Sequence, residues 1–516
     1  MARYKEYCDV QSMMLPVRLA DQLQPGTFEY TVSHLVDQEI DLSSFAARYS
    51  NDFTGAAAYD PAILLKVVLF AYSRGIIGSR RIARACEENV VFMALSGDSR
   101  PHFTTIAHFI TTMDELIGRV FTDVLSVCYA EGLIGRKMFA VDGCKISSNC
   151  AKEWSGTKAE LRKKATKIQE SIRRLLRRHR QEDEQDRGGG EAGQREKECK
   201  AIENLRAKAK KVKRFLAGSQ ERLGAGGKAV KSNITDNESA KMPSSHGVIQ
   251  GYNGIATVDA SHQVVVDAQA YGEGHEAKRL ATVVRSVRET FRGIEDGRDI
   301  FEDVVLTADS GFHSQESVEE VLDAGVDAYI ADNKFRLRDP RFSTLQEHRT
   351  KPDRKRTSIA RKYFVADDFE FDDSGTLICP AGKPMWCRCP NWRHKKKGYT
   401  GKTYQGYIEH CSACALRSKC IRNPNSPARQ VTKIDTDLPT ENKTAVQRMI
   451  ERFDSSRGRF YYSRRMGTVE PVFANIRHIL GLNRFTLRGR VKVDTQWKLF
   501  CLVHNIGKLT RYGAMA

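Results

Sequence analysis

The sequence lacks any apolar run near the roughly 18 residues that a transmembrane helix requires. Its first residues, MARYKEYCDVQSMMLPVRL, also lack the apolar core and the small-residue cleavage site of a secretory signal. These two absences argue against a membrane-spanning or exported protein. We therefore expect a cytoplasmic protein without a membrane partner.

Acidic residues are too few to balance the basic ones. The chain of 516 residues carries 83 Lys and Arg against 64 Asp and Glu, which gives a formal net charge of +19. Such a charge suits a polyanionic partner, with nucleic acid first and an anionic membrane surface second. The length exceeds one ordinary core and predicts roughly two to four domains. The 41% hydrophobic content is enough for globular folding.

Residues 1–130 are predicted to form a helical domain. Asp60 is suited to be a helix N-cap, and Pro61 follows at the first helical position. A second short helix follows two glycine turns and carries Arg80, Arg81 and Arg84. This pattern is compatible with a helix-turn-helix-like DNA-binding unit. A plain helical bundle whose arginines face water fits the pattern equally well.

Residues 151–230 are strongly basic, with 23 Lys and Arg against 12 Asp and Glu. Apolar residues recur there at helical spacing on either side of a soft Arg187–Gly190 stretch, which predicts an inserted helical hairpin. The hairpin could be a solvated charged arm. Its charge favours an arm that lies along phosphates and releases their counterions. Trp154, at its entry, could stack on a flipped base or anchor the arm by hydrophobic packing.

The segment from Lys137 to Ile330 alternates predicted strands with helices, which indicates an α/β domain with a mixed sheet. The predicted strands are 137–141, 251–260, 263–272, 303–308 and 326–330, and the predicted helices are 276–291 and 314–324. Further helices are predicted at 442–455, 470–480 and 496–509. Pro471 is expected just inside the first turn of the second of these.

Two aspartates share one design. Asp142 and Asp309 each end an apolar β run and are followed within two residues by a glycine. If their strands are neighbours, the carboxylates converge at one edge of the sheet, where they would suit Mg²⁺. Glu470 could complete the set, and two bridged metals would support phosphodiester transfer. Each Asp taken alone could equally be an ordinary turn or cap residue.

Several separate motifs resemble the DDE transposases of bacterial insertion sequences, in the same order and over nearly the whole chain. AVDGCKISSN, TADSGFHS and YSRRMGTVEPVFANIRHILGLNRFTLRGR are similar to the three acidic blocks of that family. The Pro61–Phe109 block is similar to its helical N-terminal domain, and QGYNGIATVDASHQVVVDAQ resembles its central hairpin.

The resemblance implies an RNase H-like core in which Asp142, Asp309 and Glu470 bind Mg²⁺, or Mn²⁺ as a substitute. It also implies DNA contacts by three residues around the third acid, Tyr462, Arg465 and Arg477. Arg477 replaces the usual Lys, Ala474 the common Gly and Phe312 the frequent Tyr. The loop YGEGHEA places His275 where the family often has a polar residue near the active site, although a surface role fits as well.

The resemblance further implies a cytoplasmic, nucleoid-associated bacterial protein that binds the inverted repeats of its element and target DNA, as a homodimer in the synaptic complex. The domains expected are the helical domain 1–130, a catalytic core of 131–150, 231–335 and 438–516, the basic hairpin 151–230 and a Cys-rich insertion 336–437. The alternatives are an RNase H-like nuclease and a catalytically inactive DNA-binding protein derived from a transposase.

Six of the 13 cysteines fall between Cys379 and Cys420. In a cytoplasmic protein such clustering favours a metal site over disulfides. Cys411 and Cys414 have the spacing of half a zinc knuckle, and we select Cys379 and Cys420 as the other ligands of a zinc-ribbon-like unit. The competing candidates are Cys387, Cys389 and His410, and free buried thiols are the alternative.

Overall fold

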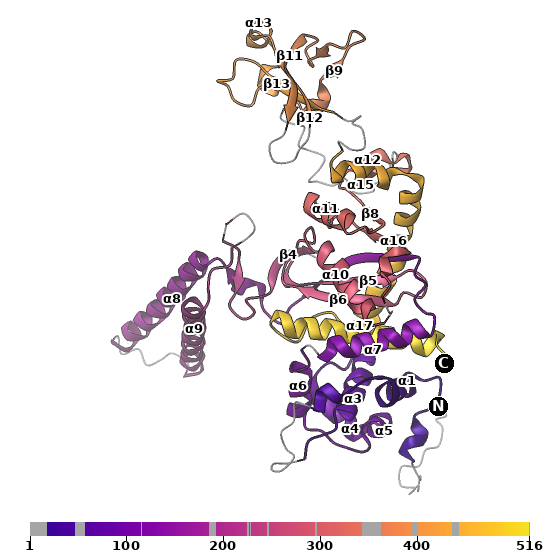
Figure 1. Cartoon of the computed structure of the whole chain (residues 1–516). Helices are drawn as coiled ribbons and strands as arrows, with labels where there is room; N and C mark the ends of the chain where they lie inside the picture. Colours follow the sequence, from indigo (N-terminus) through magenta and orange to yellow (C-terminus); the bar gives the residue numbers. More distant parts are fainter. Residues whose placement is uncertain are drawn as a thin grey trace, which may run out of the picture. The chain divides into compact units, whose positions relative to one another are not determined.

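The structure is a computed structural model that describes residues 18–46, 57–114, 116–184, 192–223, 227, 229–244, 247–294, 297–342, 363–393, 400–435 and 443–514. The chain divides into two units, which are described separately. The first comprises Met1–Phe312, Glu320–Tyr329 and Phe460–Ala516, and the second comprises His313–Glu319 and Ile330–Arg459. Figure 1 labels the helices and strands.

The N-terminal region is helical, as predicted. Asp60 caps α3 by accepting a hydrogen bond from the Ala62 amide at 2.8 Å, with Pro61 in the first turn. Buried apolar side chains of α3, including Leu64 and Val68, face the neighbouring helices. The helices are α1 (Phe28–His34), α2 (Ser43–Ala46), α3 (Pro61–Ser73), α4 (Ser79–Glu88), α5 (Val90–Ser96), α6 (Phe103–Thr111) and α7 (Leu116–Ala130).

A mixed sheet forms the centre of the first unit, in the order β4-β5-β1-β7-β8, with β6 also paired to β5. The strand β1 lies antiparallel to β5 and parallel to β7. The strands are β1 (Met138–Ser147), β4 (Ala240–Ser244), β5 (Gly247–Asp259), β6 (Val265–Tyr271), β7 (Val305–Ala308) and β8 (Ala328–Ile330). The mixed α/β architecture predicted from the sequence is therefore present.

The first predicted strand was too short. We expected β1 to end before Asp142, but it runs on to Ser147. The reason is that β1 has two neighbours of different length: its pairing with β5 continues to Ser147, whereas its pairing with β7 stops at Val141. Asp142 is thus held inside a strand, at the point where the parallel neighbour ends.

Helices cover both faces of this sheet. Phe139 of β1 stacks on Phe291 of α10 (Leu280–Arg292) at a ring distance of 6.0 Å. On the opposite face, the Trp497 indole of α17 (Arg490–Tyr512) donates to the Ile255 carbonyl at 3.0 Å. The helix α11 (Gln315–Asp323) follows β7. We predicted that α10 would begin at Glu276, but it begins four residues later, which leaves Glu276 in a loop.

The helix predicted to begin at Glu470 is part of a longer one. The helix α15 spans Ala445–Asp454, and α16 runs without a break over Ser456–Ala474, followed by a π-helical turn at Asn475–Ile479. Pro471 is therefore interior. It cannot donate to the Gly467 carbonyl, and that carbonyl instead accepts from the Gln263 side chain at 3.1 Å. This tertiary contact explains why a proline is tolerated there.

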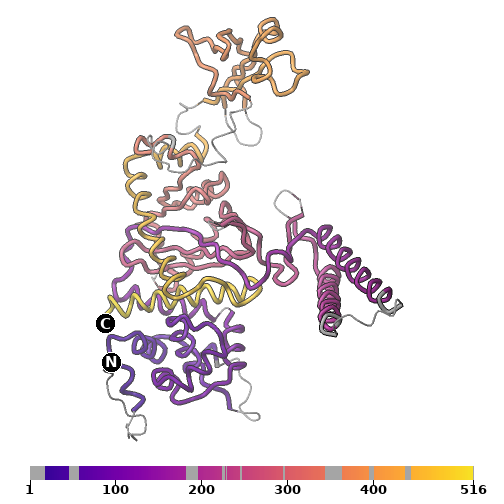
Figure 2. The backbone as a smooth tube through the Cα atoms, turned by 180° about the vertical axis from the view of Figure 1, so that it is seen from behind, coloured from indigo at the N-terminus to yellow at the C-terminus, as the bar shows by residue number. Residues whose placement is uncertain are grey.

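The predicted hairpin is formed by α8 (Lys158–Glu184) and α9 (Ala192–Gly218), which lie side by side (Figures 1 and 2). The short strands β2 (Ser155–Gly156) and β3 (Ser232–Asn233) pair at its base. Leu161, Ala165 and Val212 form its core, against which Trp154 packs. Trp154 therefore acts as an anchor, with Lys164 Nζ 4.2 Å from its ring centre. Residues 187–190 of the predicted tip lie outside the described residues.

The second unit contains a five-stranded sheet in the order β13-β12-β11-β10-β9. Phe369, Leu377, Met385, Tyr404 and Val431 form its core. The elements are α12 (Phe335–Arg338), β9 (Glu370–Phe371), β10 (Leu377–Ile378), β11 (Pro384–Arg393), β12 (Thr400–Gly406), α13 (Ile408–Ser412), α14 (Arg417–Cys420) and β13 (Gln430–Ile434). Among the described residues of the whole chain, no helix is long and apolar enough to cross a membrane.

Candidate active site

Asp142 and Asp309 meet at the centre of the sheet of the first unit. The last parallel pair between β1 and β7 joins Val141 to Ala308, and each aspartate is the next residue. The predicted convergence of these two acids is therefore present. It arises from parallel pairing, in which the carboxyl ends of neighbouring strands lie at the same edge.

Backbone amides orient both carboxylates. Asp142 Oδ1 accepts from the Gly143 amide and Asp309 Oδ1 from the Gly311 amide, each at 2.8 Å. Burial raises the pKa of Asp309, and the negative charge of Asp142 raises it further, against an opposing effect of Arg465. An acid whose ionisation is disfavoured by burial and by a neighbouring acid is a frequent feature of functional sites.

Arg465 is the residue that counters this charge. Its Nη1 donates to Asp142 Oδ2 at 2.7 Å, and only 7% of the residue is exposed. Its guanidinium carbon lies 5.5 Å from the centre of the Tyr462 ring. The structure thus brings Arg465 to the acid pair, and Tyr462, another of the three predicted DNA-contacting residues, lies beside Arg465.

Arg477, the third predicted DNA-contacting residue, lies beside Cys144. Cys144 is on β1, two residues after Asp142. Burial raises the pKa of the Cys144 thiol to about 11, and the positive charge and hydrogen bond of Arg477 oppose that rise. Within the described part of the chain, the buried Nε atoms of Arg465 and Arg477 have no hydrogen-bond acceptor. Unsatisfied guanidinium donors suit a phosphate oxygen.

Glu470 is not gathered with the two aspartates. It lies on α16 five residues after Arg465, which turns it about 140° around the helix axis. Its side chain is exposed, and it is not among the groups that shift the pKa of Asp309 or of Arg465. Its assignment as the third acid stays a prediction.

A residue that sequence reasoning missed lies at the site instead. Glu276, in the loop before α10, accepts from Asn253 Nδ2 of β5 at 2.7 Å. Burial raises its pKa, as do the charges of Asp309 and Asp142. The adjacent His275, which the family resemblance suggested near the active site, has an exposed side chain. The bare glycines that follow the two aspartates were the available signal, because they leave room for another side chain.

The donor set fits Mg²⁺, which binds one or two carboxylates and retains several waters. As they stand, no three His, Cys, Asp or Glu side chains of the described residues are arranged to hold a metal ion. Asp142 is turned toward Arg465, which accounts for this at the acid site. Asp142 and Asp309 are the residues that would hold the cation.

The basic residues predicted on the second short helix are available to a partner. Arg80, Arg81 and Arg84 are all exposed on α4, while Ile82 and Cys86 of the same helix are buried. Arg80 lies 4.9 Å from the Phe103 ring centre, and Arg84 Nε lies 3.6 Å from the Glu88 carboxylate.

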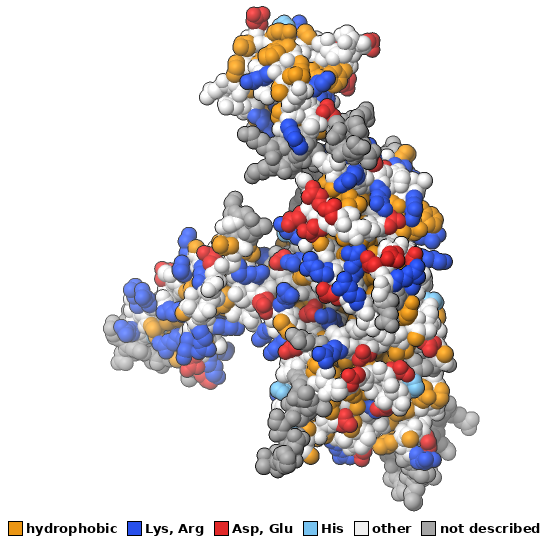
Figure 3. Space-filling view, in the orientation of Figure 1, with side chains coloured by type: hydrophobic (Ala, Val, Ile, Leu, Met, Phe, Trp, Pro, Cys, Tyr) orange, Lys and Arg blue, Asp and Glu red, His pale blue; other side chains and the backbone are white. Residues whose placement is uncertain are grey.

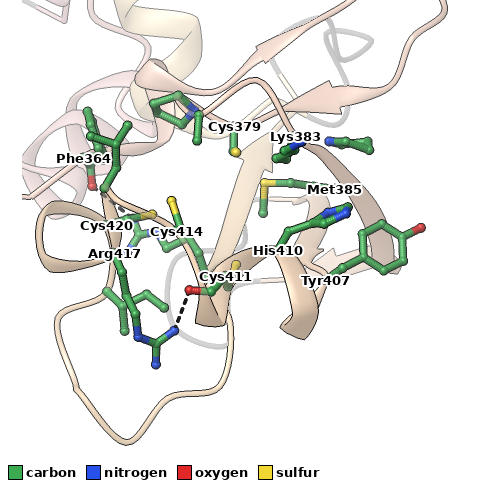
Figure 4. Close-up of a pocket in the computed structure, with 17 residues that line it drawn as sticks. Phe364, Cys379, Lys383, Met385, Tyr407, His410, Cys411, Cys414, Arg417 and Cys420 are labelled. Atoms are coloured by element: carbon green, nitrogen blue, oxygen red, sulfur yellow. Dashed lines mark hydrogen bonds between the residues drawn. The ribbon is translucent and has the colours of Figure 1, made fainter.

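The cysteines selected as zinc ligands line one pocket of the second unit (Figure 4), and they are Cys379, Cys411, Cys414 and Cys420. Burial raises the pKa of Cys420, and the other three thiols raise it further while Arg429 opposes the rise. His410 also lines this pocket, whereas Cys387 and Cys389 are not among its lining residues. Every described cysteine is a free thiol.

Comparison with known families yields two matches in separate parts of the chain. A family model described as a transposase DDE domain matches residues 378–510, which include Arg465, Glu470 and Arg477. A second, described as a transposase domain (DUF772), matches residues 17–112 of the helical N-terminal region. No curated protein matches the chain. Two separate regions of the chain are thus similar to transposase domains, and the two aspartates meet in a sheet formed by the residues between these regions. Together the two matches indicate a DDE transposase of an insertion sequence.

Proposed function

We propose that the protein binds the terminal inverted repeats of its element and catalyses metal-dependent DNA cleavage and strand transfer. The observation that carries this proposal is the meeting of Asp142 and Asp309 at the end of the parallel β1–β7 pair. Mg²⁺ held there would supply the Lewis acidity for in-line displacement at phosphorus, with Mn²⁺ as a substitute. Glu470 is the third acid of the proposal.

The chain's own residues would perform the positioning. The Gly143 and Gly311 amides fix the carboxylates. Arg465 and Arg477 each keep a buried N–H donor without an acceptor in the described part of the protein, which supports their binding of a scissile or neighbouring phosphate. A donor held in place before the substrate arrives needs no reorganisation during the reaction.

The remaining DNA contacts are proposed for exposed basic surfaces. On α4, Arg80, Arg81 and Arg84 would contact the inverted repeat. Over α8 and α9, Lys and Arg side chains crowd the surface (Figure 3), which supports a phosphate-binding arm. Because two element ends must be joined, the working form is proposed to be a homodimer, acting in the bacterial cytoplasm at the nucleoid.

The test is a cleavage and joining assay with the element end, target plasmid and Mg²⁺. Asp142→Asn, Asp309→Asn and Glu470→Gln should each abolish both reactions while end binding persists. A pre-cleaved end that is hydrolysed but never joined would identify a nuclease. Equal behaviour of wild type and all three variants would identify an inactive DNA-binding protein and overturn the proposal.

We further propose that Cys379, Cys411, Cys414 and Cys420 bind a structural Zn²⁺. Support comes from the pocket that all four cysteines line and from the effect of the other three thiols, which raise the pKa of Cys420. Metal analysis of the purified protein should give about one equivalent, and less than about half an equivalent would contradict a structural site. Cys414→Ser should lose the metal, whereas Cys387→Ser, outside the pocket, should keep it.

A further inference from the structure

Two glycines beside the acid pair are covered by one carboxylate. A Cβ atom on Gly143 would lie 2.3 Å from Glu276 Oε1, and one on Gly311 would lie 2.5 Å from Glu276 Oε2 and 2.9 Å from Asp309 Oδ1. Real side chains do not approach so closely, so both positions must remain bare for Glu276 to lie where it does. Gly311 places Glu276 beside Asp309, and the charges of both Asp309 and Asp142 act on Glu276.

A second observation concerns Asn253, which holds Glu276 in this place. Asn253 is 1% exposed, and its Nδ2 donates to Glu276 Oε1. Its Oδ1 is buried and has no donor within the described residues. A buried acceptor without a donor is unfavourable, because it has given up its hydrogen bonds to water. The waters that Mg²⁺ retains when it binds to proteins are donors of the kind this oxygen lacks.

The charge around the acid pair favours a cation as well. The carboxylate of Glu276 lies within reach of the charges of Asp309 and Asp142, and Lys145 is a positively charged side chain near it. Arg465 donates to Asp142 alone among these carboxylates. Three neighbouring carboxylates thus face two positively charged side chains, and a divalent cation would compensate the excess negative charge.

We propose that Glu276 is an additional carboxylate ligand of the site, which binds a hydrated divalent cation together with Asp142 and Asp309. This proposal rests on the proposed function, because it takes the acid pair to be the metal site. It assigns Asn253 as the positioning residue, since Asn253 orients the carboxylate and offers its free oxygen to a water of the bound ion.

The test is calorimetric titration of the metal-free, full-length protein with Mn²⁺ alone, without DNA. Glu276→Gln should weaken Mn²⁺ binding about tenfold or more. Gly143→Ala keeps every acid but places a methyl group against Glu276, and it should weaken binding as well. The matched controls are Glu273→Gln, an exposed acid of the same loop that pairs with Arg279, and Gly118→Ala, which has open space around its Cβ position. Both should bind like wild type.

The outcomes separate this inference from the proposed function. If Asp142→Asn and Asp309→Asn lose Mn²⁺ while Glu276→Gln and Gly143→Ala bind it like wild type, the inference is wrong and the proposed function stands. If the two aspartate variants bind like wild type, the acid pair is not the metal site and both proposals fail. Should Glu276→Gln fail to fold, as judged by circular dichroism, Gly143→Ala decides the matter.

Discussion

At the scale of single residues, the contact between Arg465 and Asp142 links a residue proposed to contact DNA to the acids. The Arg465 side chain is 9% exposed and that of Asp142 is 20% exposed. Water therefore screens this ion pair far less than it screens a surface pair, and loss of one partner leaves a partly buried charge uncompensated.

Arg465→Ala should therefore destabilise the first unit by about 3 kcal/mol, measured by denaturant unfolding in EDTA. Adding Asp142→Asn should recover part of the loss, because the remaining group is neutral. The neighbouring Arg464 is exposed and lies over the Phe460 ring, so Arg464→Ala should cost less than about 1 kcal/mol. Additive effects of the two substitutions at Arg465 and Asp142 would contradict a coupled pair.

The buried side chain of His504 should make the stability of the protein depend on pH. It is almost fully buried on α17, where Nε2 donates to the Gln263 carbonyl and Nδ1 accepts from Asn475. Burial lowers its pKa to about 4 from 6.5. Between pH 6.5 and 4 the unfolded chain therefore binds a proton at His504 that the folded chain does not bind. The free energy of unfolding decreases as the pH falls through this window.

His504→Gln should remove a loss of about 3 kcal/mol between pH 6.5 and pH 4, because the amide can replace both hydrogen bonds without titrating. Free energies of unfolding measured across this range provide the check. His478 is exposed, so His478→Gln should leave the profile as in wild type. If the free energy of unfolding of His504→Gln changed with pH as steeply as that of wild type, groups other than His504 would control the pH dependence.

At the scale of elements, periodicity and capping predicted which segments are helices and strands, whereas tertiary contacts decided where they end. Asp60 and Pro61 are a local signal, and α3 begins where they predict. The length of β1 depends on β5, more than 100 residues away. The continuity of α16 through Pro471 depends on Gln263, which no local pattern connects to it.

The residues of the candidate site also fall into two groups, those that local sequence patterns predict and those that tertiary contacts place. Asp142 and Asp309 were predictable because each follows an apolar run, and parallel pairing brings such positions together. Glu276 was not, because its place depends on Asn253 and on two glycines far away in the sequence, one in β1 and one in the turn after β7. Sequence reasoning assigned it to a helix, which would have fixed its direction, whereas the loop lets its side chain reach the acids.

The hairpin of α8 and α9 yields a prediction about salt. Arg173, Arg174 and Arg177 are exposed on α8. If each contacts a phosphate, replacing all three with Gln should reduce the slope of log affinity against log salt by about 2.7. Binding assays at several salt concentrations measure this slope. Any DNA should be affected alike, because phosphate contacts carry no base information.

The corresponding α4 variant, in which Arg80, Arg81 and Arg84 become Gln, provides the comparison. It should reduce the preference for the inverted repeat over unrelated DNA, because a recognition helix reads base edges. A hairpin variant with an unchanged salt slope would show that the arm faces solvent and does not lie along DNA.

At the scale of the whole molecule, the chain consists of two units that each have their own sheet. The small sheet of the second unit buries few apolar side chains, which are Phe369, Leu377, Met385, Tyr404 and Val431. A core of this size rarely supports a fold alone, and small domains commonly add a metal. Two separate cores also predict unfolding that is not two-state.

Scanning calorimetry should therefore resolve two transitions. A zinc chelator should lower the transition of the second unit and leave that of the first, because metal bound only to the folded state stabilises that state alone. Cys414→Ser should have the same effect without a chelator. A single transition that the chelator does not shift would argue against the zinc site.

Gly143 and Gly311 have a consequence for copies of this element that accumulate mutations. A change of either glycine to any other residue would leave all the acids in the sequence, yet the new Cβ would displace Glu276. Under the proposed function, a copy that retains all its carboxylates would bind element ends without cutting them, and so compete with active copies. Counting acids is therefore not enough to judge whether a copy can still move.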